Sequence, residues 1–174
     1  MGQTWNTWGY VIVAGVLSLP LAVLAALLLA RFRANSGHPH PTRTALADLG
    51  IVIGTAPWIW MILTPAPGPS GLSLIPFNDL ADVLRAPAST VLTQVGGNLL
   101  VFFALGALLP LRSARFASAL RVALVAASAS LIVEILQYGL SLGRLSSVDD
   151  VLINTAGAIA AAMITRRWWA SNTG

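Results

Sequence analysis

The chain has 174 residues, of which 56% are hydrophobic and only 9% are charged. Soluble globular domains carry roughly 25% charged residues, so this composition excludes a soluble enzyme, a disordered chain and a nucleic-acid-binding module. The net charge of +4 comes from ten scattered arginines, with no lysine to build a continuous phosphate-binding surface. The absence of cysteine excludes disulfides and thiol chemistry. We therefore expect a small integral membrane protein.

Five apolar segments organise the sequence. A helix needs about 20 apolar residues to cross the hydrocarbon core, within a range of roughly 17–25. The segments cover residues 10–30, 45–63, 95–111, 122–142 and 151–164. The last is short, so it spans only if Arg166 and Arg167 extend toward the membrane surface; otherwise it lies half-buried. We predict an all-α, polytopic transmembrane helix bundle with about five spans.

The arginines indicate the orientation of this bundle, because cytoplasmic loops of membrane proteins are enriched in positive residues. Eight arginines follow the first, third and fifth segments, and two, Arg85 and Arg144, follow the second and fourth. This pattern places the N-terminus outside and the C-terminus inside. Residues 1–10 carry no charge, whereas a signal peptide begins with positive residues, so we expect the first helix to remain uncleaved.

The chain divides into three predicted parts. Residues 1–44 form an N-terminal transmembrane helix and a basic inner loop, residues 45–165 form a four-helix membrane domain, and residues 166–174 form a short cytoplasmic tail. The longest polar connection, residues 64–93, is shorter than the roughly 40 residues that fold alone. It begins with several prolines and glycines, which predict a loop filled with turns.

Polar residues gather in the predicted outer halves of the last three segments. Glu134 and Gln137 are three residues apart, and Asp150 and Asn154 are four apart, so each pair shares a helix face. An ionisable group at membrane depth is a functional candidate by default. We expect one pocket, open to the outside, built from Glu134, Gln137, Arg144, Asp149, Asp150, Asn98 and Asn154.

The charged candidates also have structural interpretations. Glu134 needs a cation or a proton when buried, and Arg144 is the nearest cation for a structural ion pair. Asp149 is equally explained as a solvated loop residue. Asp150 lies close to the start of the last helix, where a carboxylate caps the backbone N–H groups.

The amides and serines have a simpler alternative. Asn98 and Asn154 are also explained as residues that only form hydrogen bonds between helices. Ser130 and Ser141 extend the polar stripe of the fourth segment and are better explained in the same way. No residue spacing demands a metal ion, so we predict no metal ligands, and the cofactor remains open.

An ordered set of residues carries a family resemblance. The set comprises Ile75-Pro76-Phe77, then Asn98, Phe102, Gly106 and Pro110, then Glu134-x-x-Gln137, Arg144, Asp149-Asp150-Val151, Asn154 and Gly157. In this set the chain resembles the VanZ-like family of small bacterial membrane proteins, over roughly residues 45–165. Ser73 departs from the family pattern, in which we expect an asparagine. The resemblance implies a link to lipoglycopeptide (teicoplanin) resistance and substrates that are lipid headgroups or lipid-linked.

The first functional hypothesis is an intramembrane transferase or hydrolase in the plasma membrane. It acts on a lipid headgroup or a lipid-linked cell-wall precursor. Glu134 serves as general acid or base, and the Arg144 guanidinium holds a phosphate or carboxylate. The other candidates are Gln137, Asp149 and Asp150 as catalytic residues and Asn98, Asn154 and Phe77 as substrate-binding residues.

Two alternatives use the same pocket differently. A non-catalytic binder masks a lipid-linked precursor or a drug, with the loop around Phe77 lying in the interface as a flap. A small transporter uses Glu134 to relay protons, but it ranks third because five spans show no inverted repeat. We expect the partners to be membrane lipids or a lipid-linked substrate, with no nucleic acid, and the oligomeric state is open.

Overall fold

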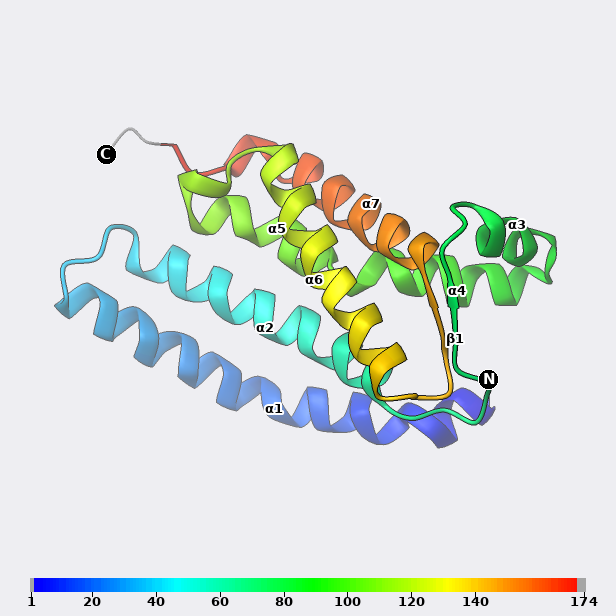
Figure 1. Cartoon of the computed structure of the whole chain (residues 1–174). Coiled ribbons are helices and arrows are strands. Elements are labelled where there is room, and N and C mark those ends of the chain that lie inside the picture. Colours follow the sequence, from blue (N-terminus) through cyan, green and yellow to red (C-terminus); the bar gives the residue numbers. More distant parts are fainter. Residues whose placement is uncertain (1, 172–174) are drawn as a thin grey trace. The chain divides into compact units, whose positions relative to one another are not determined.

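A computed structural model describes the backbone of residues 2–171. Side chains are described within that range except at residues 2–8, 10–12, 14 and 18. The chain forms two compact units, Met1–Leu49 and Gly50–Gly174. Figure 1 shows that most of the described chain is helical.

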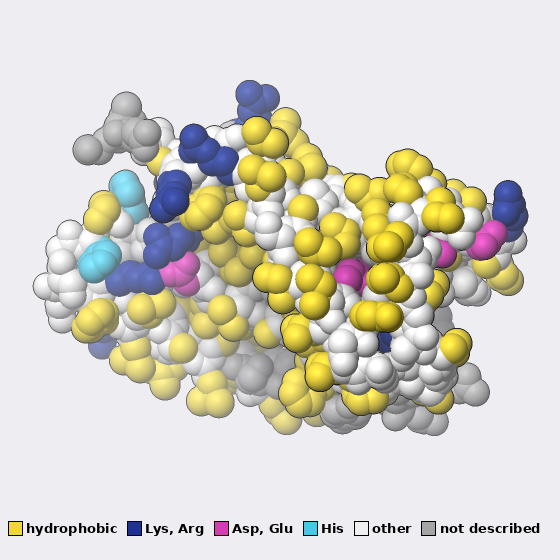
Figure 2. Space-filling view, viewed as in Figure 1, with side chains coloured by type: hydrophobic (Ala, Val, Ile, Leu, Met, Phe, Trp, Pro, Cys, Tyr) yellow, Lys and Arg dark blue, Asp and Glu magenta, His cyan; other side chains and the backbone are white. Residues whose placement is uncertain are grey.

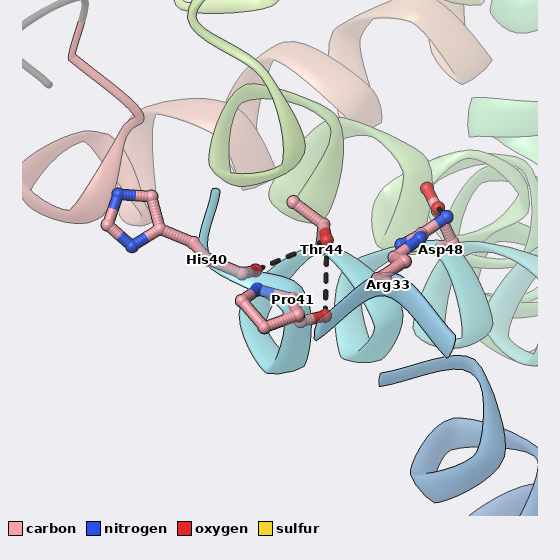
Figure 3. A network of polar contacts seen from close by, with 5 residues as sticks. All are labelled: Arg33, His40, Pro41, Thr44 and Asp48. Atoms are coloured by element: carbon pink, nitrogen blue, oxygen red, sulfur yellow. Dashed lines mark hydrogen bonds and ion pairs between the residues drawn. The ribbon is translucent and has the colours of Figure 1, made fainter. Parts of the chain in front are cut away.

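The first unit contains helix α1 (Gly2–Asn35) and the beginning of helix α2 (Pro41–Leu63). Proline suits the first position of a helix, because that position needs no N–H donor. The Thr44 hydroxyl lies 3.2 Å from the carbonyl oxygens of both His40 and Pro41 and so closes the first turn of α2 (Figure 3). Arg33 of α1 forms an ion pair with Asp48 of α2, which ties the two helices together within this unit.

The second unit holds the remaining elements. In chain order they are β1 (Gly71–Ser73), α3 (Asn78–Arg85), α4 (Ala88–Val101), α5 (Phe103–Arg112), the 3-10 turn η1 (Ala114–Phe116), α6 (Ala119–Gly139), β2 (Leu145–Ser147), α7 (Val148–Ile164) and η2 (Arg166–Trp168). A single non-helical residue, Phe102, separates α4 from α5.

Within the described residues, three helical stretches are long and apolar enough to cross a membrane. They are Pro41–Leu63, Ala88–Arg112 and Ala119–Gly139, which contain the predicted second and third spans and most of the fourth. The predicted fifth span forms α7, a helix of 17 residues. The predicted first span lies within α1, where several side chains are outside the described part of the chain. Hydrophobic side chains cover much of the face seen in Figure 2, as contact with lipid requires.

Helix α7 lies against α4, α5 and α6 and forms the centre of the second unit. Small residues allow this close packing. A β carbon on Gly106 of α5 would lie 2.1 Å from the carbonyl oxygen of Ala158, and one on Gly157 would lie 2.0 Å from that of Leu99. The helices therefore meet backbone against backbone, and α7 holds its polar first turns beside α4 and α6.

Two details of the fold differ from what the sequence predicts. Strands β1 and β2 pair in parallel, with Gly71 opposite Leu145 and Ser73 opposite Ser147. Helix α6 ends at Gly139, and Ser141 has a positive φ of 51°. The prediction that Ser141 extends the polar stripe of this helix is therefore wrong, because the chain has already turned away from the helix axis.

Candidate functional site

A pocket of about 610 Å³ lies among α3, α4, α6, α7 and the end of α2. Its polar lining consists of Asp79, Asp82, Thr93, Gln94, Asn98, Glu134, Gln137, Arg144, Ser147, Asp149, Asp150 and Asn154. The structure thus brings together seven of the eight predicted site residues, and the exception is Phe77. In Figure 2, acidic side chains appear among hydrophobic ones where α3, α4 and α6 lie in Figure 1.

Glu134 is held by the segment that leads into α7. Its Oε2 accepts a hydrogen bond of 2.9 Å from the backbone N–H of Ser147, and its backbone oxygen accepts one of 3.1 Å from the Ser146 hydroxyl. Among the described residues, ion pairs join Arg33 to Asp48 and Arg85 to Asp82, and none joins Glu134 to Arg144. The structural ion pair between Glu134 and Arg144 is therefore wrong.

Arg144 and Gln137 instead satisfy the carboxyl end of α2. The last carbonyls of a helix have no partner within it and carry partial negative charge. Arg144 Nη2 donates to the Met61 oxygen at 3.3 Å, and its Nε lies 3.5 Å from the Thr64 oxygen. Gln137 Nε2 donates to the Ile62 oxygen at 3.2 Å. Both predicted catalytic residues thus have a structural task, which fixes where each side chain lies in the pocket.

Two amide oxygens in the lining have no hydrogen-bond partner among the described residues. Asn154 Nδ2 donates to the Ser130 hydroxyl at 2.8 Å, so this amide and serine form the expected hydrogen bond between helices. Asn154 Oδ1 and Gln137 Oε1 are buried and accept no hydrogen bond from any described residue. The side chains of Asn154 and Gln137 are only 2% and 5% exposed. A buried acceptor without a donor costs roughly 1–3 kcal/mol, so a hydrogen-bond donor that reached either oxygen would recover this cost.

Ser147, not Asp150, caps the start of α7. Its hydroxyl oxygen accepts the Asp149 N–H at 3.1 Å and donates its proton to the Asp79 carboxylate. The Asp150 carboxylate accepts instead from Asn98 Nδ2, so the helix-cap interpretation of Asp150 is wrong. The hydrogen bond from Ser147 lowers the pKa of Asp79, and a further hydrogen bond from Ser73 adds to this effect. Partial burial raises the pKa by less, so the pKa stays below its usual value.

Asp149 caps a different helix, the short α3. Its two carboxylate oxygens accept the backbone N–H groups of Phe77 and, at 2.9 Å, of Leu80. A carboxylate at a helix N-terminus also faces the positive end of the helix dipole. Asp149 is only 2% exposed, so the solvated-loop interpretation is wrong. Phe77 contributes its backbone here, while its side chain is 63% exposed and does not line the pocket.

Comparison with known proteins identifies the family. A family model described as VanZ/LLP1 matches residues 51–169. The chain belongs to the VanZ/LLP1 family. No curated protein and no solved structure matches it. The VanZ/LLP1 match contains every residue that lines the pocket. Membership of this family links the chain to antibiotic resistance.

Sequence reasoning missed Asp79, Ser146 and Ser147 of this VanZ/LLP1 site. A signal for Ser147 was present, because a serine followed three residues later by an acidic residue is a helix-capping pattern, and Asp150 stands at that position. Asp79 and Ser146 had no comparable signal, since their roles depend on chain segments far apart in sequence.

We expect Ser147→Ala to raise the pKa of Asp79 and to weaken the start of α7. Loss of the cap should lower the free energy of unfolding by about 1 kcal/mol. Because the wild-type hydrogen bond favours ionised Asp79, its contribution to stability is present at neutral pH and is lost as the pH falls through the lowered pKa. Carboxyl ¹³C NMR titration of the purified protein measures the pKa, and thermal unfolding measures the stability.

Ser73→Ala is the matched control for this prediction. It removes a weaker hydrogen bond to Asp79 and leaves the cap of α7 intact. It should therefore raise the pKa of Asp79 less than Ser147→Ala and leave thermal stability near that of the wild type. An equal pKa rise in both variants would contradict the dominant role of Ser147.

We expect Asp149→Ala to release the beginning of α3. Two backbone N–H groups lose their acceptor, and a loss of about 1.4 kcal/mol corresponds to about tenfold faster hydrogen exchange. Hydrogen–deuterium exchange at residues 77–80 measures this effect. Asp82→Asn is the control, because Asp82 forms only an exposed pair with Arg85 on the same helix. Unchanged exchange in Asp149→Ala would show that α3 is held by other contacts.

Proposed function

We propose that this VanZ/LLP1 protein takes the headgroup of a membrane lipid or a lipid-linked cell-wall precursor into the pocket from the extracytoplasmic side. There it transfers or hydrolyses the headgroup. The single observation that carries this proposal is the convergence of a backbone-held carboxylate, Glu134, with Arg144 and two unpartnered amide oxygens in one pocket.

The surroundings of the pocket favour a lipid as ligand. Its volume of about 610 Å³ falls in the range of roughly 300–1,000 Å³ that is typical of small-ligand sites. On α6, which carries Glu134 on its buried face, Leu131, Ile132 and Ile135 are each more than half exposed. A lipid lying along this apolar surface can keep its acyl chains in the membrane while its headgroup enters the pocket.

The arginine distribution indicates which side of the membrane the pocket faces. The pocket is built from the end of α2, the end of α6 and the start of α7. These are the ends that the arginine distribution assigns to the outer face. The proposed substrate is therefore a lipid or precursor of the outer leaflet.

Glu134 is the proposed general acid or base. The N–H of Ser147 fixes one of its carboxylate oxygens, and positioned carboxylates typically contribute 10²–10⁴-fold to such reactions. Arg144 uses Nε and Nη2 for the carbonyls of α2, whereas its Nη1 donates to no described residue. This leaves Nη1 to bind an anionic part of the headgroup.

A non-catalytic binder is the second candidate, and one observation favours it. Arg144 and Gln137 cap α2, and Asp149 caps α3. Three of the five predicted catalytic residues are therefore engaged in holding the fold. A protein of this kind would grip the headgroup and mask it without changing it.

Comparative lipid analysis tests the proposal. Cells that express the chain are compared with cells that lack it, for teicoplanin susceptibility and for the composition of phospholipids and lipid-linked precursors. We expect one headgroup class to change together with susceptibility. Altered susceptibility with unchanged lipids would select the masking binder, and no change in either property would reject both functions.

A further inference from the structure

Negative charge is concentrated in the pocket. The chain has six acidic residues, and five of them line this one pocket, where Arg144 is the only arginine in the lining. Of the five, Asp82 pairs with Arg85 at an exposed position. Asp79, Glu134, Asp149 and Asp150 form no ion pair with any described residue. Glu134 and Asp149 are buried, and hydrogen bonds from neighbouring groups, without a paired cation, are what the described chain supplies to these carboxylates.

Two of these carboxylates stand out as ligand groups. Asp149 uses both oxygens for the N–H groups of α3, and Asp79 receives the Ser147 hydroxyl. The Glu134 carboxylate accepts the Ser147 N–H and interacts with the Ser146 hydroxyl, the Asp150 carboxylate accepts from Asn98, and the two charges act on each other. A positively charged group near both would relieve this repulsion.

The unpartnered amide oxygens point to the same kind of ligand. Gln137 and Asn154 are more than nine-tenths buried, and each presents a carbonyl oxygen that accepts nothing from the described chain. A protonated primary amine brings positive charge and three N–H donors in one small group. It can therefore offset the negative charge of the carboxylates and donate hydrogen bonds to the amide oxygens.

We propose that the headgroup bound in this pocket carries a protonated primary amine, which Glu134 and Asp150 receive together with the amide oxygens of Gln137 and Asn154. This inference rests on the proposed headgroup function and specifies its substrate class. The headgroup is zwitterionic, because Arg144 Nη1 accommodates an anionic group beside the amine. An anionic headgroup without an amine would face five carboxylates with one guanidinium to offset them.

A metal ion fits these residues less well than an amine. In the part of the chain that the structure describes, no three histidine, cysteine, aspartate or glutamate side chains are grouped closely enough to hold one. A divalent cation needs several oxygen ligands at short and regular distances. Hydrogen bonds to an ammonium group tolerate the wider spacing of a lined pocket.

Ligand discrimination tests the inference on the purified full chain. Native mass spectrometry compares the retention of dihexanoyl phosphatidylethanolamine, its N-acetylated derivative and dihexanoyl phosphatidylglycerol. We expect the free amine to bind at least tenfold more tightly than either other lipid. Glycerophosphoethanolamine, which has the headgroup but no acyl chains, should bind at least tenfold more weakly than the lipid. Equal binding of that soluble compound would overturn the lipid as the source of the amine.

Two variants assign the amine to its site. Glu134→Gln and Asp150→Asn should each weaken phosphatidylethanolamine binding by about tenfold. Neither should weaken phosphatidylglycerol binding, because each removes a negative charge that opposes an anionic headgroup. Asp48→Asn is the matched control, because Asp48 is the one acidic residue outside the pocket, and it should bind as the wild type does. Circular dichroism during thermal unfolding confirms that each variant is folded.

The outcomes separate this inference from the function on which it rests. If all three lipids bind the wild type equally and Arg144→Ala weakens them all, the headgroup site stands and the amine is wrong. If phosphatidylglycerol binds more tightly than phosphatidylethanolamine, the amine is again wrong. If no variant of a pocket residue changes the retention of any lipid, the headgroup site itself is wrong.

Discussion

Glu134→Gln is expected to abolish the change in lipid composition that the wild-type chain produces in cells. The substitution keeps the size of the side chain and an oxygen that can accept the Ser147 N–H, but it removes the group that exchanges a proton. Loss of a general acid or base typically lowers the rate by about 10²–10⁴-fold. Teicoplanin susceptibility and the lipid profile should both return to those of cells without the chain.

Arg144→Ala and Asp48→Asn complete this experiment. Asp48→Asn makes the same carboxylate-to-amide change outside the pocket and should retain the wild-type lipid profile at equal expression. Retention of resistance by Glu134→Gln, with its loss in Arg144→Ala, would contradict catalysis and support the masking binder. That pattern would mean that the Arg144 guanidinium holds the headgroup without the Glu134 carboxylate, so it would count against the amine contact proposed for Glu134 as well as against catalysis.

Gly157→Ala is expected to destabilise the protein and to disrupt the pocket. The new β carbon would lie 2.0 Å from the Leu99 carbonyl oxygen and within 3 Å of two further backbone atoms of that residue. Helices α4 and α7 must therefore separate, and overpacking of this kind costs typically 1–3 kcal/mol. Asp150 and Asn154 move with α7, so ligand retention should fall together with the unfolding temperature.

Gly97→Ala is the control for this close approach. Gly97 lies in α4, the same helix that Gly157 contacts, and a β carbon there would meet no atom within 4 Å. Because alanine is favoured over glycine in helices by about 0.5–1 kcal/mol, this variant should be as stable as the wild type or slightly more stable. Equal destabilisation of the two variants would show that helix contact at Gly157 is not the cause.

The apolar helices and the buried face of α6 were accessible from the sequence. Long hydrophobic segments between arginines predict them directly, because lipid imposes both length and composition. The spacing of Glu134 and Gln137 placed these residues on one face, and both are buried in the structure. The strands β1 and β2, by contrast, have three residues each, which is too short to show a period in the sequence.

The convergence of polar residues was predictable, whereas their partners were not. Helix spacing and orientation bring Asn98 and Asp150 to one depth, and the structure joins them by a hydrogen bond. Arg144 was expected beside Glu134 on grounds of charge alone. It lies instead against the end of α2, because unpaired carbonyls at a helix terminus compete for the guanidinium. Such competition depends on tertiary contacts that local patterns do not encode.

The turn before β2 determines the position of Arg144 in the pocket. Gly143 has a φ of 69°, and a β carbon there would lie 1.9 Å from the Ala66 carbonyl oxygen. Hydrogen bonds from Ala66 N–H to the Leu142 oxygen and from Gly143 N–H to the Ser70 hydroxyl fasten the two connections together at this point. These contacts fix the backbone next to Arg144, so we expect one added methyl group at Gly143 to displace the Arg144 side chain.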